Sequence, residues 1–124
     1  MDKSKDLRFS KLLDFYSPVL TEKQQNAAYA YYNDDYSLGE IAENEGISRQ
    51  GVRDNIKRAE AVMLELESQI HLLERAEKYF EFSDRLAVLV NEIDAEIKAR
   101  GSLAAIHTRN ENIKDLLNEY KDLF

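Results

Sequence analysis

Apolar side chains recur at intervals of three and four residues through most of this chain, which is the spacing of one face of an α-helix. From Lys5 to about Ser17 the pattern predicts a first helix, which Ser17-Pro18 ends because proline disfavours helical backbone at the residue before it. Thr21, with Gln24 three residues later, forms a capping box and predicts a second helix. Since the chain holds only four glycines and one proline, we expect an all-α fold.

The stretch from Ser37 to Glu60 combines the signals of two helices joined by a tight turn. Ser37 and Glu40 form another capping box, Gly46 stands where the first helix must stop, and Ser48 can cap the second. The inward positions that follow the helical period are Leu38, Ile41 and Ala42, and then Val52, Ile56 and Ala59. This arrangement predicts a helix-turn-helix.

The polar side chains of the second helix point away from its apolar stripe and match what a DNA major groove offers. Arginine can bridge two acceptors on guanine, glutamine can pair with adenine, and helix N-termini favour phosphate. We therefore predict that Arg49, Gln50 and Arg53 lie nearest the bases. Lys57, Arg58 and the helix starts at Ser37 and Ser48 are predicted to lie near phosphate.

A long apolar stripe continues beyond this motif. It runs through Ile56, Ala59, Met63, Leu66, Ile70, Leu73 and Phe80, which is the spacing of a heptad seam. Because no strong breaker occurs between Arg49 and about Tyr79, we expect one helix of roughly 30 residues, about 45 Å long at ~1.5 Å per residue.

Two more amphipathic segments follow the long stripe. One begins near Ser83 and stops before Gly101-Ser102, and the last ends in Leu123 and Phe124, whose apolar side chains would suit docking. A lone helix cannot bury such stripes, so the long helices pair either within the chain or between two chains. We divide the chain into a helix-turn-helix domain, residues 1–60, and a long-helix dimerisation region, residues 61–124, and expect a homodimer.

The charge is unevenly distributed. The net charge is −7, yet four basic residues face two acidic ones between Ser48 and Glu60. Between Ala61 and Arg100, nine acidic residues face five basic ones. A polyanion such as DNA should be held at the candidate helix and repelled from the later helices, so we expect weak to moderate affinity.

Other chemistries have little support in the sequence. There is no cysteine, no glycine-rich phosphate loop and no nucleophile elbow, so we expect neither an enzyme nor a cofactor. His71 near Glu67 and Glu74, and His107 near Glu111, have spacings that could bind a metal, but chance explains them better in so glutamate-rich a chain. We predict no metal site.

The sequence also bears on location. No apolar run approaches the roughly 20 residues that span a bilayer, and the first residues lack the apolar core of a signal peptide. We therefore expect a cytoplasmic protein without a membrane partner.

Four tyrosines, Tyr29, Tyr31, Tyr32 and Tyr36, lie in or just after the second predicted helix. They could stack on bases, but aromatic residues around one small helix more often pack at the edge of a core. We favour packing.

The residues that predict the helix-turn-helix also carry a resemblance. Thr21-Glu22-Lys23-Gln24, Tyr36-Ser37-Leu38-Gly39-Glu40-Ile41-Ala42, Ile47-Ser48-Arg49-Gln50 and Asp54-Asn55-Ile56-Lys57-Arg58 resemble the YlxM family of small bacterial proteins. The resemblance covers most of the chain and is weakest after about Arg100. The same region is more loosely similar to the promoter-reading C-terminal domain of sigma factors.

The resemblance implies an all-helical, DNA-binding-like protein. It also implies a link to the signal recognition particle pathway, because the family's gene commonly neighbours that of the particle's GTPase. Two hypotheses follow. The chain is a DNA-binding regulator, dimeric through its long helices, or it is an adaptor that contacts the particle's GTPase or RNA through the acidic stretch from Glu65 to Glu96.

Overall fold

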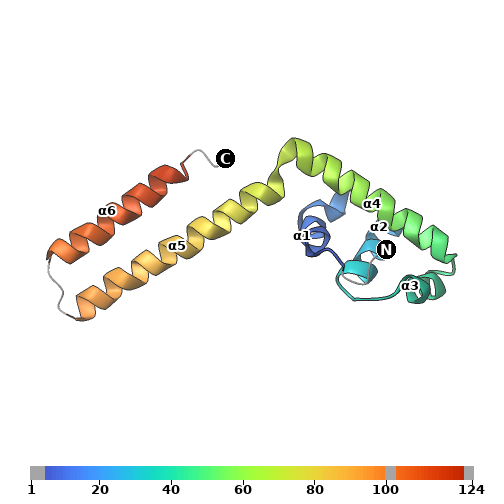
Figure 1. The fold of residues 1–124 in the computed structure, drawn as a ribbon, viewed down its shortest axis with the longest axis horizontal. Coiled ribbons are helices and arrows are strands. Elements are labelled where there is room, and N and C mark those ends of the chain that lie inside the picture. Colours follow the sequence, from blue (N-terminus) through green and yellow to red (C-terminus); the bar gives the residue numbers. More distant parts are fainter. Residues whose placement is uncertain (1–4, 100–102, 122–124) are drawn as a thin grey trace. The chain divides into compact units, whose positions relative to one another are not determined.

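The computed structural model describes residues 5–99 and 103–121, which form six α-helices and one short 3₁₀ helix (Figure 1). The first elements are α1 (Leu7–Tyr16), η1 (Ser17–Val19), α2 (Glu22–Tyr32) and α3 (Leu38–Glu45). They are followed by α4 (Arg49–Ile70), α5 (Leu72–Lys98) and α6 (Leu103–Glu119). The all-α prediction is confirmed. The docking prediction for Leu123 and Phe124 lies outside the described residues.

Contacts divide the chain into two compact units, residues 1–73 and 74–124. The first unit contains α1 to α4 and the start of α5, and the second contains the rest of α5 together with α6. The functional division into residues 1–60 and 61–124 stays a prediction. No helix in the described ranges is both long and apolar enough to cross a bilayer.

Two clusters of buried side chains hold the first unit together, and α4 contributes to both. One cluster consists of Leu12, Leu13, Tyr16, Leu20, Ala28, Ala59, Met63 and Leu73. The other packs α3 against α2 and α4 through Ala27, Tyr31, Ile41, Ala42, Val52 and Ile56. The helix that carries the candidate recognition residues is therefore also the helix around which this unit is built.

The predicted starts of the second and third helices are confirmed. Thr21 with Gln24, and Ser37 with Glu40, form reciprocal capping boxes at the starts of α2 and α3. Each pair satisfies backbone N–H groups that a helix start would otherwise leave unpaired.

The predicted single helix from Arg49 to about Tyr79 is wrong, and so is the helix start near Ser83. α4 ends at Ile70, His71 adopts a left-handed conformation with φ 57°, and α5 then runs without a break from Leu72 to Lys98. The turn therefore falls at a histidine, where the sequence offers no glycine or proline.

The physical reason for this break lies in long-range contacts. The buried carboxylate of Glu67 accepts the backbone N–H of Leu73 at 2.9 Å, and the Tyr16 hydroxyl accepts that of Leu72 at 3.3 Å. These bonds satisfy the first N–H groups of α5, which an uninterrupted helix would have satisfied itself. Leu73 joins the core beside Leu12 and Leu13.

The second unit is a hairpin in which α5 and α6 run side by side in opposite directions (Figure 1). Arg85 pairs with Glu119 at 3.1 Å and Arg109 with Glu92 at 3.2 Å, while the rings of Phe82 and Tyr120 lie 5.4 Å apart. These two helices thus pair within the chain.

Candidate nucleic-acid interface

α3 and α4 are joined by the turn that the sequence predicted. Gly46 ends α3 with φ 67°, a left-handed conformation that favours glycine, and the N–H of Ile47 then donates to Ala42 at 3.1 Å. Ser48 accepts the N–H of Gly51 at 3.0 Å and begins α4. Val52 and Ile56 face the core and are fully buried. The helix-turn-helix geometry is therefore confirmed.

Five of the seven candidate residues lie exposed on the N-terminal half of α4: Arg49, Gln50, Arg53, Lys57 and Arg58. Arg49, Arg53 and Lys57 are spaced four residues apart, so they share one ridge of the helix. In the described part of the chain, Arg53 and Arg58 make no ion pair. Their guanidinium groups are thus open to an external anion.

Arg49 is placed by Gly39, a residue that the sequence analysis missed. A Cβ atom at Gly39 would lie 3.0 Å from one terminal guanidinium nitrogen of Arg49 and 3.2 Å from its Nε. The guanidinium therefore lies directly against the first turn of α3, where any larger residue would displace it. A glycine inside a short helix, ten residues before an arginine at a helix start, was the available signal.

Gln50 is held by Asp54, one turn further along α4. The Gln50 amide nitrogen donates to the Asp54 carboxylate at 2.9 Å. This bond uses one of the amide's two N–H groups, so the second N–H and the carbonyl oxygen stay available. Asp54 also places a negative charge among the basic residues.

Lys57 belongs to a network that the sequence did not predict. Its ammonium group lies 3.3 Å from Glu60, whose buried carboxylate also accepts the hydroxyl of Tyr32. Burial, followed by the bond to Glu60, raises the pKa of Tyr32 well above its usual value of 10.0. Lys57 is therefore partly neutralised before any ligand binds.

The burial of Glu60 and Glu67 lowers the number of exposed acidic side chains below the sequence count. By sequence alone both belong with the other acids, but each is buried and each accepts a tyrosine hydroxyl, from Tyr32 and Tyr16 respectively. Neither carboxylate adds to an exposed acidic surface. The basic surface on the N-terminal half of α4 therefore opposes fewer exposed acids than the sequence count gives.

Ser37 and Ser48 act as helix caps. Ser37 accepts the N–H of Glu40 at 3.1 Å, so its hydroxyl, like that of Ser48, already satisfies its own helix. Their predicted place near phosphate rests on the positive ends of α3 and α4 and not on a free hydroxyl.

Lys5 holds the loop before α3 in place, a role that no local sequence pattern indicates. Its ammonium group donates to the Tyr36 carbonyl at 2.8 Å, lies 3.1 Å from the Asp35 carboxylate and sits 4.1 Å from the centre of the Tyr31 ring. Asp35 has a positive φ of 58°. These contacts fix the chain where it enters the motif at Ser37.

The favoured packing role of the tyrosines is confirmed for three of the four. Tyr31 is buried, while Tyr29 and Tyr32 are half-buried and donate their hydroxyls to Ser17 and Glu60. Tyr36 is exposed.

In the described ranges, no three histidine or acidic side chains are close enough to hold a metal ion.

A family model described as "Putative helix-turn-helix protein, YlxM / p13 like" matches residues 3–103. The chain belongs to this family, UPF0122. A UPF0122 protein of Limosilactobacillus reuteri is 45% identical over 92 residues, which cover 74% of this chain and 81% of that protein. One from Halalkalibacterium halodurans is 49% identical over 88 residues, or 71% and 81% of the two chains. The matched residues include the whole helix-turn-helix, so membership of UPF0122 agrees with the geometry of α3 and α4.

Proposed function

We propose that this protein binds DNA through the N-terminal half of α4, which enters the major groove, and that it acts in this way as a regulator. The observation that carries the proposal is the exposed ridge of Arg49, Arg53 and Lys57 on the second helix of a capped helix-turn-helix. A helix of this kind fits a major groove, and arginine is the side chain that most often reads guanine there.

Each candidate side chain has a role in this proposal. Arg49, Gln50 and Arg53 contact base edges, while Lys57, Arg58 and the N–H groups at the starts of α3 and α4 contact phosphates. The protein acts as a homodimer, so that two copies of α4 reach successive major grooves about 34 Å apart. The Lys57–Glu60 ion pair and Asp54 reduce the net positive charge of this surface, so we expect selective DNA binding of modest affinity.

The test is a selection of bound sequences from random DNA and, in parallel, from total RNA at the same salt concentration. The expected result is a DNA consensus with two half-sites. Arg53→Ala should weaken binding to that consensus by about 1–3 kcal/mol and relax one position. Arg75→Ala, an exposed arginine of α5, is the matched control and should bind normally. Unchanged binding by Arg49→Ala and Arg53→Ala would overturn the proposal.

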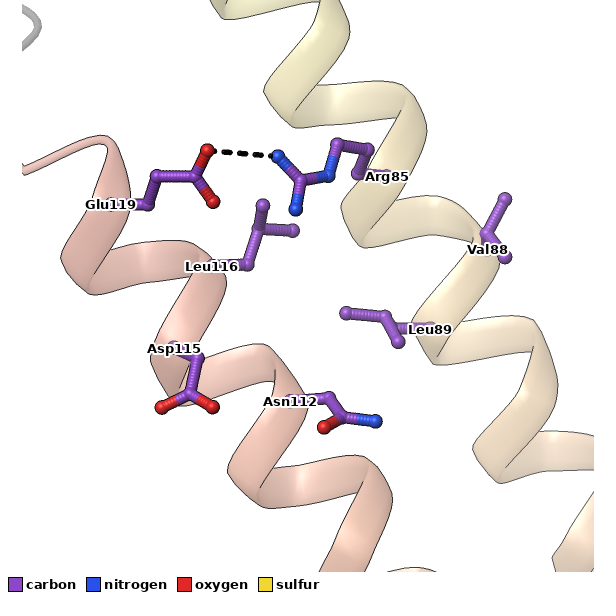
Figure 2. Close-up of a pocket in the computed structure, with 7 residues that line it drawn as sticks. All are labelled: Arg85, Val88, Leu89, Asn112, Asp115, Leu116 and Glu119. Atoms are coloured by element: carbon purple, nitrogen blue, oxygen red, sulfur yellow. Dashed lines mark hydrogen bonds and ion pairs between the residues drawn. The ribbon is translucent and has the colours of Figure 1, made fainter.

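A second candidate function is that of an adaptor in the signal recognition particle pathway, the link that the family resemblance implies. The observation that favours it is the exposure of acidic side chains along α5, among them Glu81 and Asp84. A groove of about 420 Å³ between α5 and α6 adds the carboxylate of Asp115, while that of Glu119 is paired with Arg85 (Figure 2). An acidic surface suits a basic partner protein. Reversing the exposed acids of α5, Glu81 and Asp84, should then abolish capture of the particle, while Arg53→Ala should leave it intact.

A further inference from the structure

Asp54 occupies the centre of the surface that α4 presents to solvent. At about 100° per residue, it lies roughly half a turn from the mean direction of the buried apolar side chains of α4, which are Val52, Ile56, Ala59 and Met63. Among residues 49–58, no other side chain lies so directly opposite the core. Asp54 also stands between Gln50 and Arg58 at four-residue spacing, so these three share a second ridge of the helix. In the proposed complex, an acidic side chain therefore faces the floor of the major groove.

The Asp54 carboxylate is only half used within the protein. One of its oxygens, Oδ1, accepts the amide N–H of Gln50 at 2.9 Å. Arg58 follows one turn later, at the spacing where an acid and a base pair on a helix, yet in the described part of the chain no ion pair joins it to Asp54. Lys57 is paired with Glu60 instead. The second oxygen, Oδ2, thus stays open to a donor outside the protein.

The chemistry of the major groove decides what this oxygen can bind. A carboxylate accepts hydrogen bonds but donates none, so the acceptor edges of guanine and thymine repel it. Adenine offers an amino group beside the acceptor N7, whereas cytosine offers its N4 amino group with no acceptor beside it. We propose that Asp54 is a specificity-determining residue, whose Oδ2 accepts the N4 amino group of a cytosine. This inference rests on the proposed function and names a base that the bound DNA must present.

The contact between Asp54 and Gln50 extends this preference to a second base. Because a carboxylate has no donor, the N–H side of the Gln50 amide faces Asp54. The other N–H and the carbonyl oxygen remain, and together these two groups match N7 and N6 of adenine. Asp54 therefore fixes which groups the Gln50 amide presents, and the preferred half-site should contain an adenine near the cytosine.

The negative charge of Asp54 separates selectivity from affinity. It repels the phosphates of any DNA that approaches α4, whatever the sequence of that DNA. A correctly placed cytosine compensates for this repulsion and other bases do not. Asp54 thus lowers nonspecific binding and raises the ratio of specific to nonspecific affinity.

The experiment compares the DNA preferences of wild type and Asp54→Asn, first by selection from random DNA. Fluorescence anisotropy then measures binding to duplexes with C·G or T·A at each cytosine of the selected site. At one such position, the wild type should prefer cytosine about tenfold over thymine. In Asp54→Asn this preference should disappear, because an amide nitrogen can then oppose the cytosine amino group, while affinity for random DNA rises several-fold. Asp84→Asn, which removes the same charge from an exposed position of α5, is the matched control and should keep the wild-type preference.

The ratio of two affinities keeps the test valid if a variant is partly unfolded, since a loss of folded protein lowers both affinities equally. Asp54→Ala should relax the adenine preference as well, whereas Asp54→Asn retains an amide oxygen that accepts from Gln50. If Asp54→Asn selected the same cytosine as the wild type, this inference would be overturned and the proposed function would stand. A wild type that selects no DNA would overturn both.

Discussion

The hydroxyl of Tyr16 donates to the carboxylate of Glu67 across 2.6 Å, in the buried interior of the first unit. The residues are 51 positions apart, and the bond joins α1 to the last turns of α4. The same carboxylate oxygen accepts the N–H of Leu73 at 2.9 Å. The buried carboxylate of Glu67 thus links the end of α1 to the turn between α4 and α5.

We expect Glu67→Ala to lower the free energy of unfolding by about 2–4 kcal/mol, because it leaves a buried hydroxyl and a buried N–H without their acceptor. Glu67→Gln keeps an acceptor oxygen in place and should cost less than half as much. Urea denaturation of both variants measures the difference. Equal losses for glutamine and alanine would show that the acceptor is not what stabilises the turn.

The left-handed conformation of His71 predicts a backbone effect. His71→Gly and His71→Val both remove the imidazole, but only glycine adopts φ 57° without steric cost. The glycine variant should therefore be more stable than the valine variant by about 1–2 kcal/mol. If the valine variant were equally stable, α4 and α5 would be able to form the uninterrupted helix that the sequence predicts.

This break shows what the sequence could and could not predict. Capping boxes and the positive φ of Gly46 depend on residues within a few positions of each other, so Ser37, Gly46 and Ser48 were predicted correctly. The turn at His71 depends on Tyr16 and Glu67, which are far apart in the chain, and no local pattern signals it. The candidate basic residues were found because an exposed helix face follows from periodicity alone.

The burial of Glu60 and Glu67 could not be predicted from the sequence for the same reason. Glu60 and Glu67 lie seven residues apart on the inward side of α4, a position that apolar residues usually take. Their burial depends on tyrosines of α1 and α2 that donate to them. Likewise, the contact of Gly39 with Arg49 becomes visible only when α3 and α4 are placed together.

The raised pKa of Tyr32 predicts a dependence on alkaline pH. The phenol ionises near pH 10.0 in the unfolded chain and at a higher pH in the folded one. Its contribution to stability is therefore complete below pH 10 and is lost as the pH rises above it, by up to about 1.4 kcal/mol per pH unit. Unfolding at pH 8 to about 11 should show a smaller alkaline loss for Tyr32→Phe than for the wild type. Tyr36→Phe, at an exposed position, should behave as wild type.

Gly39→Ala should separate folding from binding. Alanine favours helix over glycine, so the free energy of unfolding should stay equal or rise by up to about 1 kcal/mol. The new methyl group would push the Arg49 guanidinium away from α3, since the two would approach within 3.0 Å. Binding to a selected DNA should weaken several-fold in fluorescence anisotropy, like that of Arg49→Ala. If the variant bound DNA as tightly as the wild type, Arg49 would not belong to the surface that contacts DNA.

Contact between α4 and DNA makes a quantitative prediction for the salt dependence of binding. Affinity for the selected DNA should fall with salt, and Arg58→Ala should reduce the slope of log affinity against log salt by about 0.9 without changing the preferred sequence. Arg53→Ala should instead relax the preference. A wild-type protein that binds no DNA above background at low salt, or an affinity that does not change with salt, would contradict the account.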